Sequence, residues 1–341
     1  MKQVRLYGQQ DLRMDEVPAP SPGPADAVVK VAMSGICGTD LGFLRQGYIG
    51  LRPHPGCSMP LGHEVVGIIH AVGEAVQGLA LGQRVVVHPM RAPNRIGTGD
   101  PAHGAFAEYL LVRDAAAGKT VFPVSERLSD ERIALAEPLA VAMHGLNIAR
   151  AAPGESAIIY GAGPIGLSAL VCLKHRGAGK VAVVDVVPHR LERARQLGAD
   201  IVVNPQEGEL RAALLEQMGT VRSPFTGQRK VDCALHFDCA GHGPLLEQAI
   251  NLACTHARIV MLATHKQPVP LNMTELMMQE VALLGSISYP DEFPEVLAML
   301  EDERIDLRPM VSHVYAFAEF QDAFATAQQA GESAKVLLRM A

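Results

Sequence analysis

The glycine-rich segment 161–166, with the sequence GAGPIG, constrains the fold of this chain more than any other feature. It follows the short apolar run 156–160, which is typical of a buried strand, and it precedes an apolar helical pattern. Gly161 permits a tight turn, Gly163 leaves room for a pyrophosphate, and Gly166 allows the helix to pack closely on the strand. The N-terminus of that helix would add amide donors for the phosphates. The segment therefore predicts a dinucleotide-binding turn.

An acidic residue after the next strand supports this prediction and indicates which dinucleotide is bound. The run 181–184 is apolar and leads to Asp185, which lies 22 residues after Gly163. A carboxylate at this place accepts hydrogen bonds from an adenosine ribose and repels a 2′-phosphate. A lone glycine-rich turn would be weak support, but strand, turn, helix, strand and acid occur here in register. We therefore expect NAD as the cofactor.

Composition narrows the remaining classes of function. A chain of 341 residues with 48% hydrophobic residues predicts two domains with packed cores. The net charge of −6 gives no electrostatic reason to expect nucleic acid or an anionic membrane as a partner. No apolar run approaches the roughly 20 residues of a membrane span, and the first residues lack the apolar segment of a signal peptide. We expect a cytoplasmic protein without nucleic-acid or membrane partners.

The pattern of predicted secondary structure changes along the chain. Up to about residue 116, short strands punctuated by glycine and proline predict an antiparallel, barrel-like β domain. A helical stretch follows at 129–149, interrupted by Pro138. From residue 155 strands and helices alternate, which predicts a doubly wound parallel sheet. Its later strands are expected at 199–203, 233–238, 258–263 and 281–286, and the polar segment 219–230 is expected to form a loop.

Residues of the types that bind catalytic zinc occur at distant places in the chain. Cys37 stands between glycines at the end of a predicted strand, His63 and Glu64 lie together in PLGHE, and Glu137 precedes a proline at a helix start. Thiolate, imidazole and carboxylate can together hold zinc and leave a position open for substrate. Spacing alone does not establish such a site. The other cysteines (Cys57, Cys172, Cys233, Cys239 and Cys254) form no CxxC pair and predict no disulfide framework.

The adjacency of His63 and Glu64 raises a geometric question. Neighbouring residues on a regular strand point to opposite faces, so both could not reach one metal there. Pro60 and Gly62 indicate that the chain is still turning at this point, which would let both side chains converge. The alternative is that Glu64 pairs with a basic residue beneath the site. For Glu137 the alternative is an ordinary carboxylate at a helix start, where the helix dipole favours it.

Taken together, these segments make the chain resemble the medium-chain dehydrogenase/reductase family. The likeness is to its zinc-dependent polyol and sugar-acid branch, which includes sorbitol and L-idonate 5-dehydrogenases. The matching segments follow the family's order from residue 35 to the end: GICGTD, PLGHEVVG, GQRVVV, GAFAEYLLV, AEPLAVAMHG, GAGPIGL, DVVPHR, LGADIVVNP and AKVLLR.

The resemblance implies an α/β protein with two domains. A GroES-like β-barrel catalytic domain would comprise residues 1–149 and 291–341, and a Rossmann NAD-binding domain would comprise residues 150–290. Zinc would be held by Cys37 and His63, and Glu64 and Glu137 would supply the remaining oxygen contacts. A hydroxyl in the position of Thr39 would receive the proton of the substrate.

The resemblance also implies a set of cofactor contacts and a homo-oligomer. Arg190 resembles the arginine that flanks the adenosine in this family, and the strand at 281–286 resembles the edge that relatives use to pair subunits as dimers or tetramers. The complete set of expected cofactor residues is Gly161, Gly163, Pro164, Ile165, Gly166, Asp185, Arg190, Leu262 and Ser286.

Three departures from the family pattern bear on function. The lobe at 88–104 contains no cysteine, so we expect one catalytic zinc per chain and no structural zinc; a replacement site on His88 and His103 is the alternative. Gly42 stands where alcohol-dehydrogenase relatives often carry a proton-relay histidine. Ser288 stands where polyol relatives show an arginine, which leaves the identity of the substrate open.

The function that the resemblance implies is a zinc-dependent oxidoreductase. It would transfer a hydride between NAD and a secondary alcohol, which would be a small-molecule polyol, sugar or sugar acid such as L-idonate. Two alternatives remain open at this point. One is a metal-free, NADPH-dependent quinone or enone reductase, and the other is a non-catalytic nucleotide-binding protein.

Overall fold

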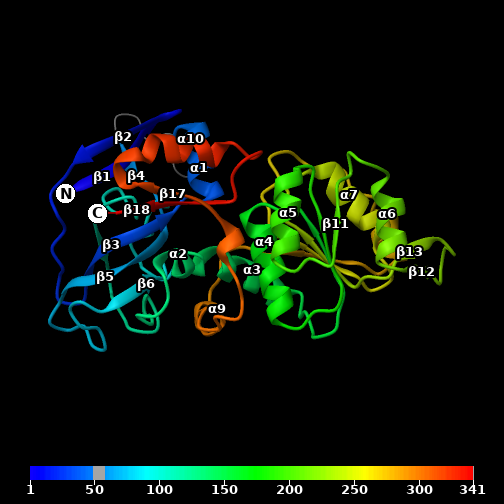
Figure 1. Cartoon of the computed structure of the whole chain (residues 1–341), viewed down its shortest axis with the longest axis horizontal. Coiled ribbons are helices and arrows are strands. Elements are labelled where there is room, and N and C mark those ends of the chain that lie inside the picture. Colours follow the sequence, from blue (N-terminus) through cyan, green and yellow to red (C-terminus); the bar gives the residue numbers. More distant parts are fainter. Residues whose placement is uncertain (49–57, 341) are drawn as a thin grey trace. The chain divides into compact units, whose positions relative to one another are not determined.

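The computed structural model describes residues 1–48 and 58–340, so Cys57 lies outside the described residues. The chain folds into two compact units (Figure 1). The first unit comprises Met1–Glu137 and Phe293–Ala341, and the second comprises Pro138–Glu292. Among the described residues, no helix has the length and apolar character needed to cross a membrane.

The first unit is built on a sheet of seven strands that is antiparallel except for one pair. Its strands follow the order β17-β18-β3-β5-β6-β8, and β7 also pairs with β3. The parallel pair is β17 and β18. The bounds are β3 Ala27–Gly35, β5 Glu64–Val72, β6 Arg84–Val87, β7 Tyr109–Val112, β8 Val121–Pro123, β17 Val311–Ala316 and β18 Lys335–Arg339. A smaller sheet joins β1 Lys2–Gly8 to β2 Asp11–Glu16 and β4 Met59–Pro60.

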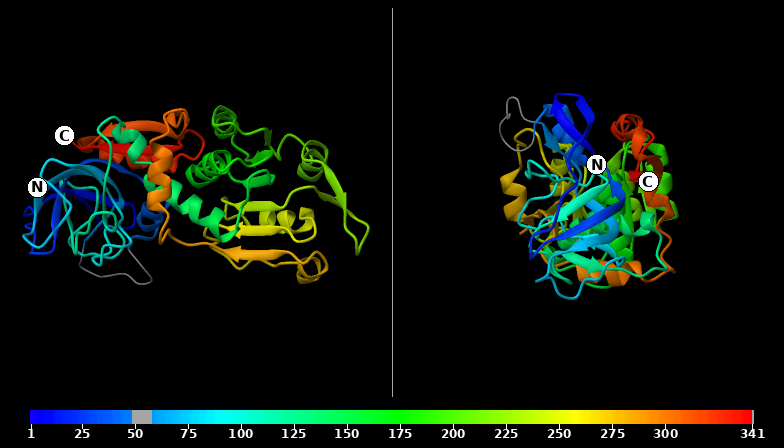
Figure 2. Two further views of the ribbon diagram at one scale, coloured as in Figure 1. Left: turned by 90° about the horizontal axis from the view of Figure 1, so that it is seen from below. Right: turned by 90° about the vertical axis from the view of Figure 1, so that its left-hand side faces the viewer.

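Alternating valines and isoleucines on the central strands form the core of this unit. Val29, Val31 and Ile69 are fully buried there, and α10 (Phe320–Gln328) covers the core with Phe324. Helix α10 lies against β17 and β18 (Figure 2). The other helices are α1 Gly38–Gln46, α2 Asp130–Ile133, α9 Phe293–Leu300 and the first residues of α3, Ala136–Ile148.

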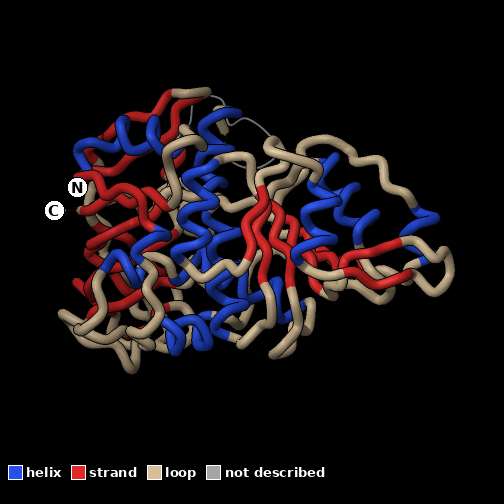
Figure 3. The backbone as a smooth tube through the Cα atoms, turned by 45° about the vertical axis from the view of Figure 1, so that its right-hand side comes forward, coloured by secondary structure: helices blue, strands red, loops and turns tan. Residues whose placement is uncertain are grey.

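The second unit contains a six-stranded parallel sheet (Figure 3). Its strands follow the order β11-β10-β9-β14-β15-β16, with the bounds β9 Ala157–Tyr160, β10 Val181–Val184, β11 Ile201–Val203, β14 Leu235–Asp238, β15 Arg258–Met261 and β16 Ala282–Gly285. The order reverses between β9 and β14, which is the place where open α/β sheets bind ligands, beyond the carboxyl ends of the strands. The helices are α4 Pro164–His175, α5 Pro188–Gln196, α6 Leu210–Gln217, α7 Gly243–Leu252 and α8 Met273–Met278.

Both faces of this sheet are covered, because β9 and β10 are buried along their whole length. Ile158 and Tyr160 face a core that includes Leu214 of α6 and Leu246 of α7. Helices α4 and α5 lie on the other side of the sheet (Figure 1). The expected combination of a GroES-like domain and a doubly wound parallel sheet is confirmed.

One local prediction was wrong. The segment 219–230 is not a simple loop, because β12 (Thr220–Arg222) and β13 (Arg229–Val231) form a two-stranded hairpin. Lys230 anchors this hairpin through a buried ion pair with Glu275. The helical stretch at 129–149 is interrupted as expected, since α2 ends at Ile133 and α3 begins at Ala136. Pro138 lies just after this break, in the first turn of α3, where a proline displaces no intrahelical hydrogen bond.

Candidate active site

Cys37 is fixed at the junction of β3 and α1. It is the N-cap residue of α1, and its sulfur accepts a hydrogen bond from the backbone N–H of Thr39 at 3.5 Å. Its own backbone N–H donates to the Asp40 carboxylate at 2.9 Å. These two bonds form a reciprocal cap. The cap fixes the position of the thiol at the end of β3, although glycines lie close to it on both sides.

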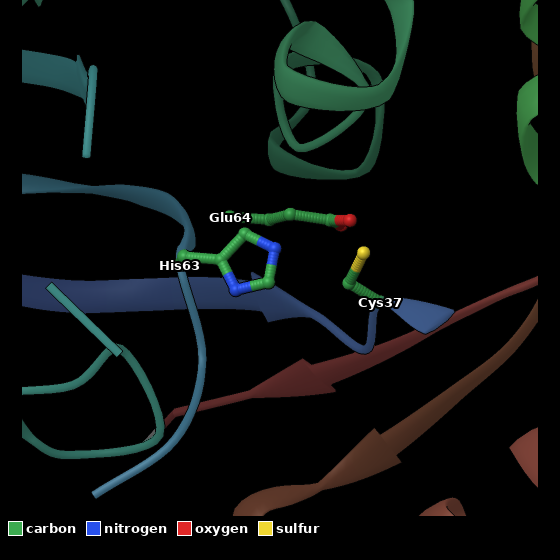
Figure 4. Close-up of side chains that lie close together, drawn as sticks. All are labelled: Cys37, His63 and Glu64. Atoms are coloured by element: carbon green, nitrogen blue, oxygen red, sulfur yellow. The ribbon is translucent and has the colours of Figure 1, made fainter. Parts of the chain in front are cut away.

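His63 and Glu64 both reach the thiol because the strand has not yet begun at His63. Gly62 has a φ of +90°, a backbone conformation that side chains rarely adopt, and β5 starts only at Glu64. The ligand atoms of Cys37, His63 and Glu64 all lie within 4.8 Å of one another. Figure 4 shows the three side chains pointing toward one another. The turn at Pro60–Gly62 thus removes the geometric objection to a shared ion.

The Glu64 carboxylate has two distinct environments. One oxygen, Oε1, accepts a hydrogen bond from the ammonium group of Lys335 in an ion pair that is almost completely buried. The other, Oε2, is buried and has no hydrogen-bond partner in the protein. Gly35 pairs with Glu64 across β3 and β5 and leaves the space for that oxygen. Glu64 therefore does pair with a basic residue, and its second oxygen stays buried without a hydrogen-bond partner.

The electrostatics of the cluster favour a bound cation. Burial opposes protonation of His63, but the charges of Asp40 and Cys37 outweigh it and raise the pKa of His63 well above its ordinary value. Burial likewise opposes the charged form of Lys335, and Glu64 and Cys37 outweigh it, so the pKa of Lys335 is also raised. Both shifts reflect an excess of negative charge. A thiolate, an imidazole and a carboxylate with a free oxygen form a donor set that fits zinc.

Glu137 and Thr39 lie near this cluster without belonging to it. Glu137 lies in the first turn of α3, has 7% of its surface exposed, and lies outside the group formed by Cys37, His63 and Glu64. Its negative charge nevertheless contributes to the raised pKa of His63. Thr39 is exposed in the first turn of α1. Its hydroxyl is therefore accessible to a small molecule bound beside the thiol.

The lobe at residues 88–104 is organised by a carboxylate. Asp100 is buried and accepts hydrogen bonds from the Asn94 side chain at 2.8 Å and from the backbone N–H groups of Ala102 and His103 at 2.8 and 3.1 Å. His88 packs its ring against Phe293. In the described part of the chain, Cys37, His63 and Glu64 are the only group of three or more potential metal ligands close enough to share an ion.

The glycines of the segment 161–166 have three different steric surroundings. Gly161 has a φ of +103°, and a Cβ atom there would lie 3.0 Å from the backbone that follows β14. A Cβ on Gly166 would lie 1.8 Å from the carbonyl oxygen of Gly161. Gly163 has open space, with Arg190 as the nearest group at 3.8 Å. As the N-cap of α4 it has no side chain to engage the first amides, which are left available to an anion.

Asp185 and Arg190 flank this turn. The Asp185 carboxylate accepts hydrogen bonds from the backbone N–H groups of Ala162 at 2.6 Å and Val187 at 2.9 Å, which fix its position. The Arg190 Nε is buried and has no hydrogen-bond partner. Burial lowers the pKa of Arg190 and the charge of Asp185 opposes this. An arginine and a carboxylate therefore face the same turn.

Leu262 and Ser286 follow β15 and β16 at the same edge of the sheet. The backbone N–H of Leu262 donates to the Asp238 carbonyl at 2.9 Å, and that of Ser286 donates to the Met261 carbonyl at 3.1 Å. The Ser286 hydroxyl is buried without a hydrogen-bond partner. All nine expected cofactor residues thus lie at the carboxyl edge of one sheet or in the elements that follow it.

Sequence reasoning missed two polar contacts at these sites. Lys335 lies 271 residues from Glu64 in the sequence, and only its place in the terminal AKVLLR segment could have drawn attention to it. Asp238 accepts hydrogen bonds from the backbone N–H groups of Ala240 and Gly241, and its other oxygen lies 2.6 Å from His265 Nε2. This pair ties together the loops that follow β14 and β15. No residue pattern signals it.

Comparison with known proteins places both units in one family. Residues 164–302 match the zinc-binding dehydrogenase family, and residues 23–124 match the alcohol dehydrogenase GroES-like domain. The chain is 30% identical to (R,R)-butanediol dehydrogenase of Neisseria gonorrhoeae, over 92% of this chain and 91% of the relative. It is 29% identical to sorbitol dehydrogenase of Bacillus subtilis, over 96% of this chain and 94% of the relative.

Solved structures of similar proteins contain either nicotinamide dinucleotide. A short chain alcohol dehydrogenase from Escherichia coli CFT073, complexed with NADH, has a TM-score of 0.85 and 26% identity, with 99% of each chain covered. A zinc-binding dehydrogenase from Sinorhizobium meliloti 1021, bound to NADP, has a TM-score of 0.84 and 28% identity, with 99% of this chain and 98% of that chain covered. With both domains matched and the ligand types of the family brought together, the chain belongs to the zinc-dependent medium-chain dehydrogenase/reductase family.

Proposed function

We propose that this chain is a dehydrogenase that uses zinc to transfer a hydride between a secondary alcohol and NAD. The observation that carries the proposal is the convergence of Cys37, His63 and Glu64 within 4.8 Å, with Glu64 Oε2 buried and unpartnered. Relatives named for butanediol and sorbitol support the substrate class, since both compounds carry secondary hydroxyl groups. The substrate is accordingly a polyol, a sugar or a sugar acid.

Four side chains have roles at the metal in this proposal. Cys37 and His63 bind zinc directly, and Glu64 and Glu137 supply oxygen contacts, one of them through a water molecule. Zinc in this position would act as a Lewis acid toward the substrate hydroxyl. The buried Lys335 balances part of the negative charge that the ligands bring together. We propose one zinc per chain, because the lobe at 88–104 contains no cysteine to bind a second one.

Thr39 receives the proton of the substrate hydroxyl. A threonine hydroxyl can accept one hydrogen bond while it donates another, so it can pass a proton onward without changing its own charge. Its exposure in the first turn of α1, two residues after Cys37, supports this role. Gly42 lies on α1, three residues after Thr39, and a Cβ atom there would have no other atom within 4 Å. Water therefore has room beside this part of the helix. We assign the onward step to water at that place.

The segment 161–166 and its neighbours bind the dinucleotide. The amides at the start of α4 bind the pyrophosphate, and the open space at Gly163 admits it. Asp185 retains free lone pairs for the ribose hydroxyls and disfavours a 2′-phosphate, so the cofactor is NAD. Arg190 flanks the adenosine, and Leu262 and Ser286 contact the nicotinamide half. The bound nicotinamide would accept the hydride.

We infer a homo-oligomer in the cytoplasm. Strand β16 is the last strand of the sheet, and Ile287, which follows it, has 87% of its surface exposed. An unpaired edge next to an exposed apolar side chain favours pairing with a second chain. Sedimentation at several protein concentrations measures the assembly, and a monomer throughout would refute it.

A substrate panel tests the proposed function. Polyols, aldonates and simple secondary alcohols are each incubated with NAD or NADP, and the absorbance of the reduced cofactor is followed with and without a chelator. We expect NAD-dependent turnover that the chelator abolishes and zinc restores. Cys37→Ala should lose activity and bound zinc but keep NADH binding, whereas Cys254→Ala should keep all three. Reduction of a quinone or an enone with NADPH by the chelated enzyme, without turnover of any alcohol, would support the metal-free reductase instead.

A further inference from the structure

Lys335 is a buried cation that contacts two of the segments that carry the expected zinc ligands. It begins β18, and only 2% of its surface is exposed. Its ammonium group donates to the carbonyl oxygen of Ile36 at 3.3 Å and to the Glu64 carboxylate. Ile36 immediately precedes Cys37. One side chain therefore bridges the backbone next to the thiol and the carboxylate opposite it.

The strand framework makes this bridge rigid. Strand β18 pairs with β3 with Leu337 opposite Gly35, and Ile36 donates its N–H to the Val336 carbonyl at 3.0 Å. Gly35 in turn pairs with Glu64 of β5. The lysine thus stands at the end of a strand whose register is fixed relative to both ligand segments.

Lys335 also determines which carboxylate oxygen of Glu64 is free. Oε1 is held by the ammonium group, and Oε2 occupies the space that the missing Cβ of Gly35 leaves. Among the described residues, the ammonium group is the only hydrogen-bond donor to this carboxylate, and it engages Oε1 alone. We propose that Lys335 is a positioning residue that fixes Glu64 Oε2 toward the metal, an inference that rests on the proposed function.

Two opposite effects on metal affinity separate positioning from simple charge balance. Loss of an oriented partner of a metal ligand lowers metal affinity about 10- to 100-fold. Loss of a positive charge near a divalent cation has the opposite effect, since like charges repel each other. If the lysine acts by positioning, its removal weakens zinc binding. If it acts only as a charge, its removal strengthens zinc binding.

The test compares Lys335→Met with a matched variant elsewhere. Lys230→Met removes another buried lysine, which is 1% exposed and paired with Glu275 in the other unit. Zinc affinity is measured by competition with a chelator, the cobalt-substituted protein is examined by absorption spectroscopy, and the apo proteins are melted. We expect zinc binding to be about 10- to 100-fold weaker in Lys335→Met, with a changed cobalt spectrum, and unchanged zinc affinity in Lys230→Met.

A double-mutant cycle shows whether Lys335 acts through Glu64. Zinc affinity in Glu64→Ala combined with Lys335→Met should be no weaker than in Glu64→Ala alone, because Lys335 then has no ligand to orient and only its charge repulsion is lost. If Lys335→Met does not fold, Lys335→Arg decides the matter, since it keeps the charge and alters the geometry. A normal cobalt spectrum and normal zinc affinity in the arginine variant would overturn positioning.

Unchanged or tighter zinc binding in a folded Lys335→Met protein would also overturn this inference. Failure of the proposed function gives a different result, because the unsubstituted protein would then bind neither zinc nor cobalt at Cys37. Loss of cobalt binding in Cys37→Ala, together with normal binding in Lys335→Met, would retain the proposed function and reject the role of Lys335 alone.

Discussion

Gly35 and Glu64 lie opposite each other on β3 and β5, and a Cβ atom on Gly35 would lie 1.7 Å from Glu64 Oε2. The absence of a side chain at one position therefore creates the place of a carboxylate oxygen at another. This relationship connects strand register directly to the chemistry of the candidate zinc site.

Gly35→Ala should displace Glu64 from the cluster. The added methyl group cannot share space with Oε2, so we expect zinc binding to weaken at least about tenfold and stability to fall by about 1–3 kcal/mol. Chelator competition and thermal melting measure the two effects. Gly8→Ala is the matched control, because nothing lies within 4 Å of a Cβ there. Normal zinc affinity in Gly35→Ala would show that Glu64 does not need its present orientation.

Gly166→Ala should lower the stability of the protein, whereas Gly163→Ala should weaken its binding of NADH. A Cβ at Gly166 would lie 1.8 Å from the Gly161 carbonyl oxygen, so this variant should be less stable by about 1–3 kcal/mol. At Gly163 the nearest atom is 3.8 Å away, so the protein should keep its stability but bind NADH more weakly. Melting curves and NADH fluorescence titrations distinguish the two outcomes. Equal effects of both substitutions on stability would contradict the assigned roles.

Asp185→Asn should relax the choice of cofactor. An asparagine retains an oxygen that can accept the hydrogen bond from Ala162, and it removes the negative charge that repels a 2′-phosphate. We expect the ratio of kcat/KM for NAD to that for NADP to fall at least about tenfold, a change of about 1.4 kcal/mol. Steady-state kinetics with both cofactors provide the measurement. An unchanged ratio would refute the assignment of Asp185 to the ribose.

Acid should destabilise the second unit through His236. This ring is buried, Tyr160 bonds to its Nδ1 at 2.9 Å, and burial lowers its pKa to about 4. The pKa of His236 in the folded protein lies below its unfolded value of about 6.5. The contribution of the neutral ring to the free energy of unfolding is therefore complete above pH 6.5 and is lost as the pH falls toward 4. It amounts to about 3 kcal/mol.

The test of this contribution is the slope of stability against pH. His236→Asn should unfold with a shallower dependence between pH 6.5 and 4, although it is less stable at neutral pH. His256→Asn, at an exposed position, should keep the original slope. Identical slopes in all three proteins would mean that His236 does not titrate as its burial requires.

Local patterns were sufficient to predict most of the architecture. The parallel sheet follows from apolar strands that alternate with amphipathic helices. The turn at 161–166 could be predicted from its three glycines, each of which has a different steric environment in the structure. The hairpin at β12 and β13 was missed because its polar composition is typical of loops, and its anchor, the Lys230–Glu275 pair, joins residues 45 apart in sequence.

The candidate site was only partly predictable for the same reason. Cys37, His63 and Glu64 could be identified by residue type, and Gly62 indicated the turn that lets the last two converge. The partner of Glu64 could not be predicted, because Lys335 reaches it only after β18 has paired with β3. Pairing between distant strands leaves no local trace in the sequence.

The carboxylate of Asp100 has a practical consequence for work on this protein. Since side-chain and amide hydrogens hold the surrounding loop in shape, removal of the zinc that we propose at Cys37 should leave that loop intact. The emptied polypeptide can then be refilled with cobalt or another divalent ion on an undamaged scaffold. We therefore expect metal exchange to be a reversible way to probe the proposed reaction.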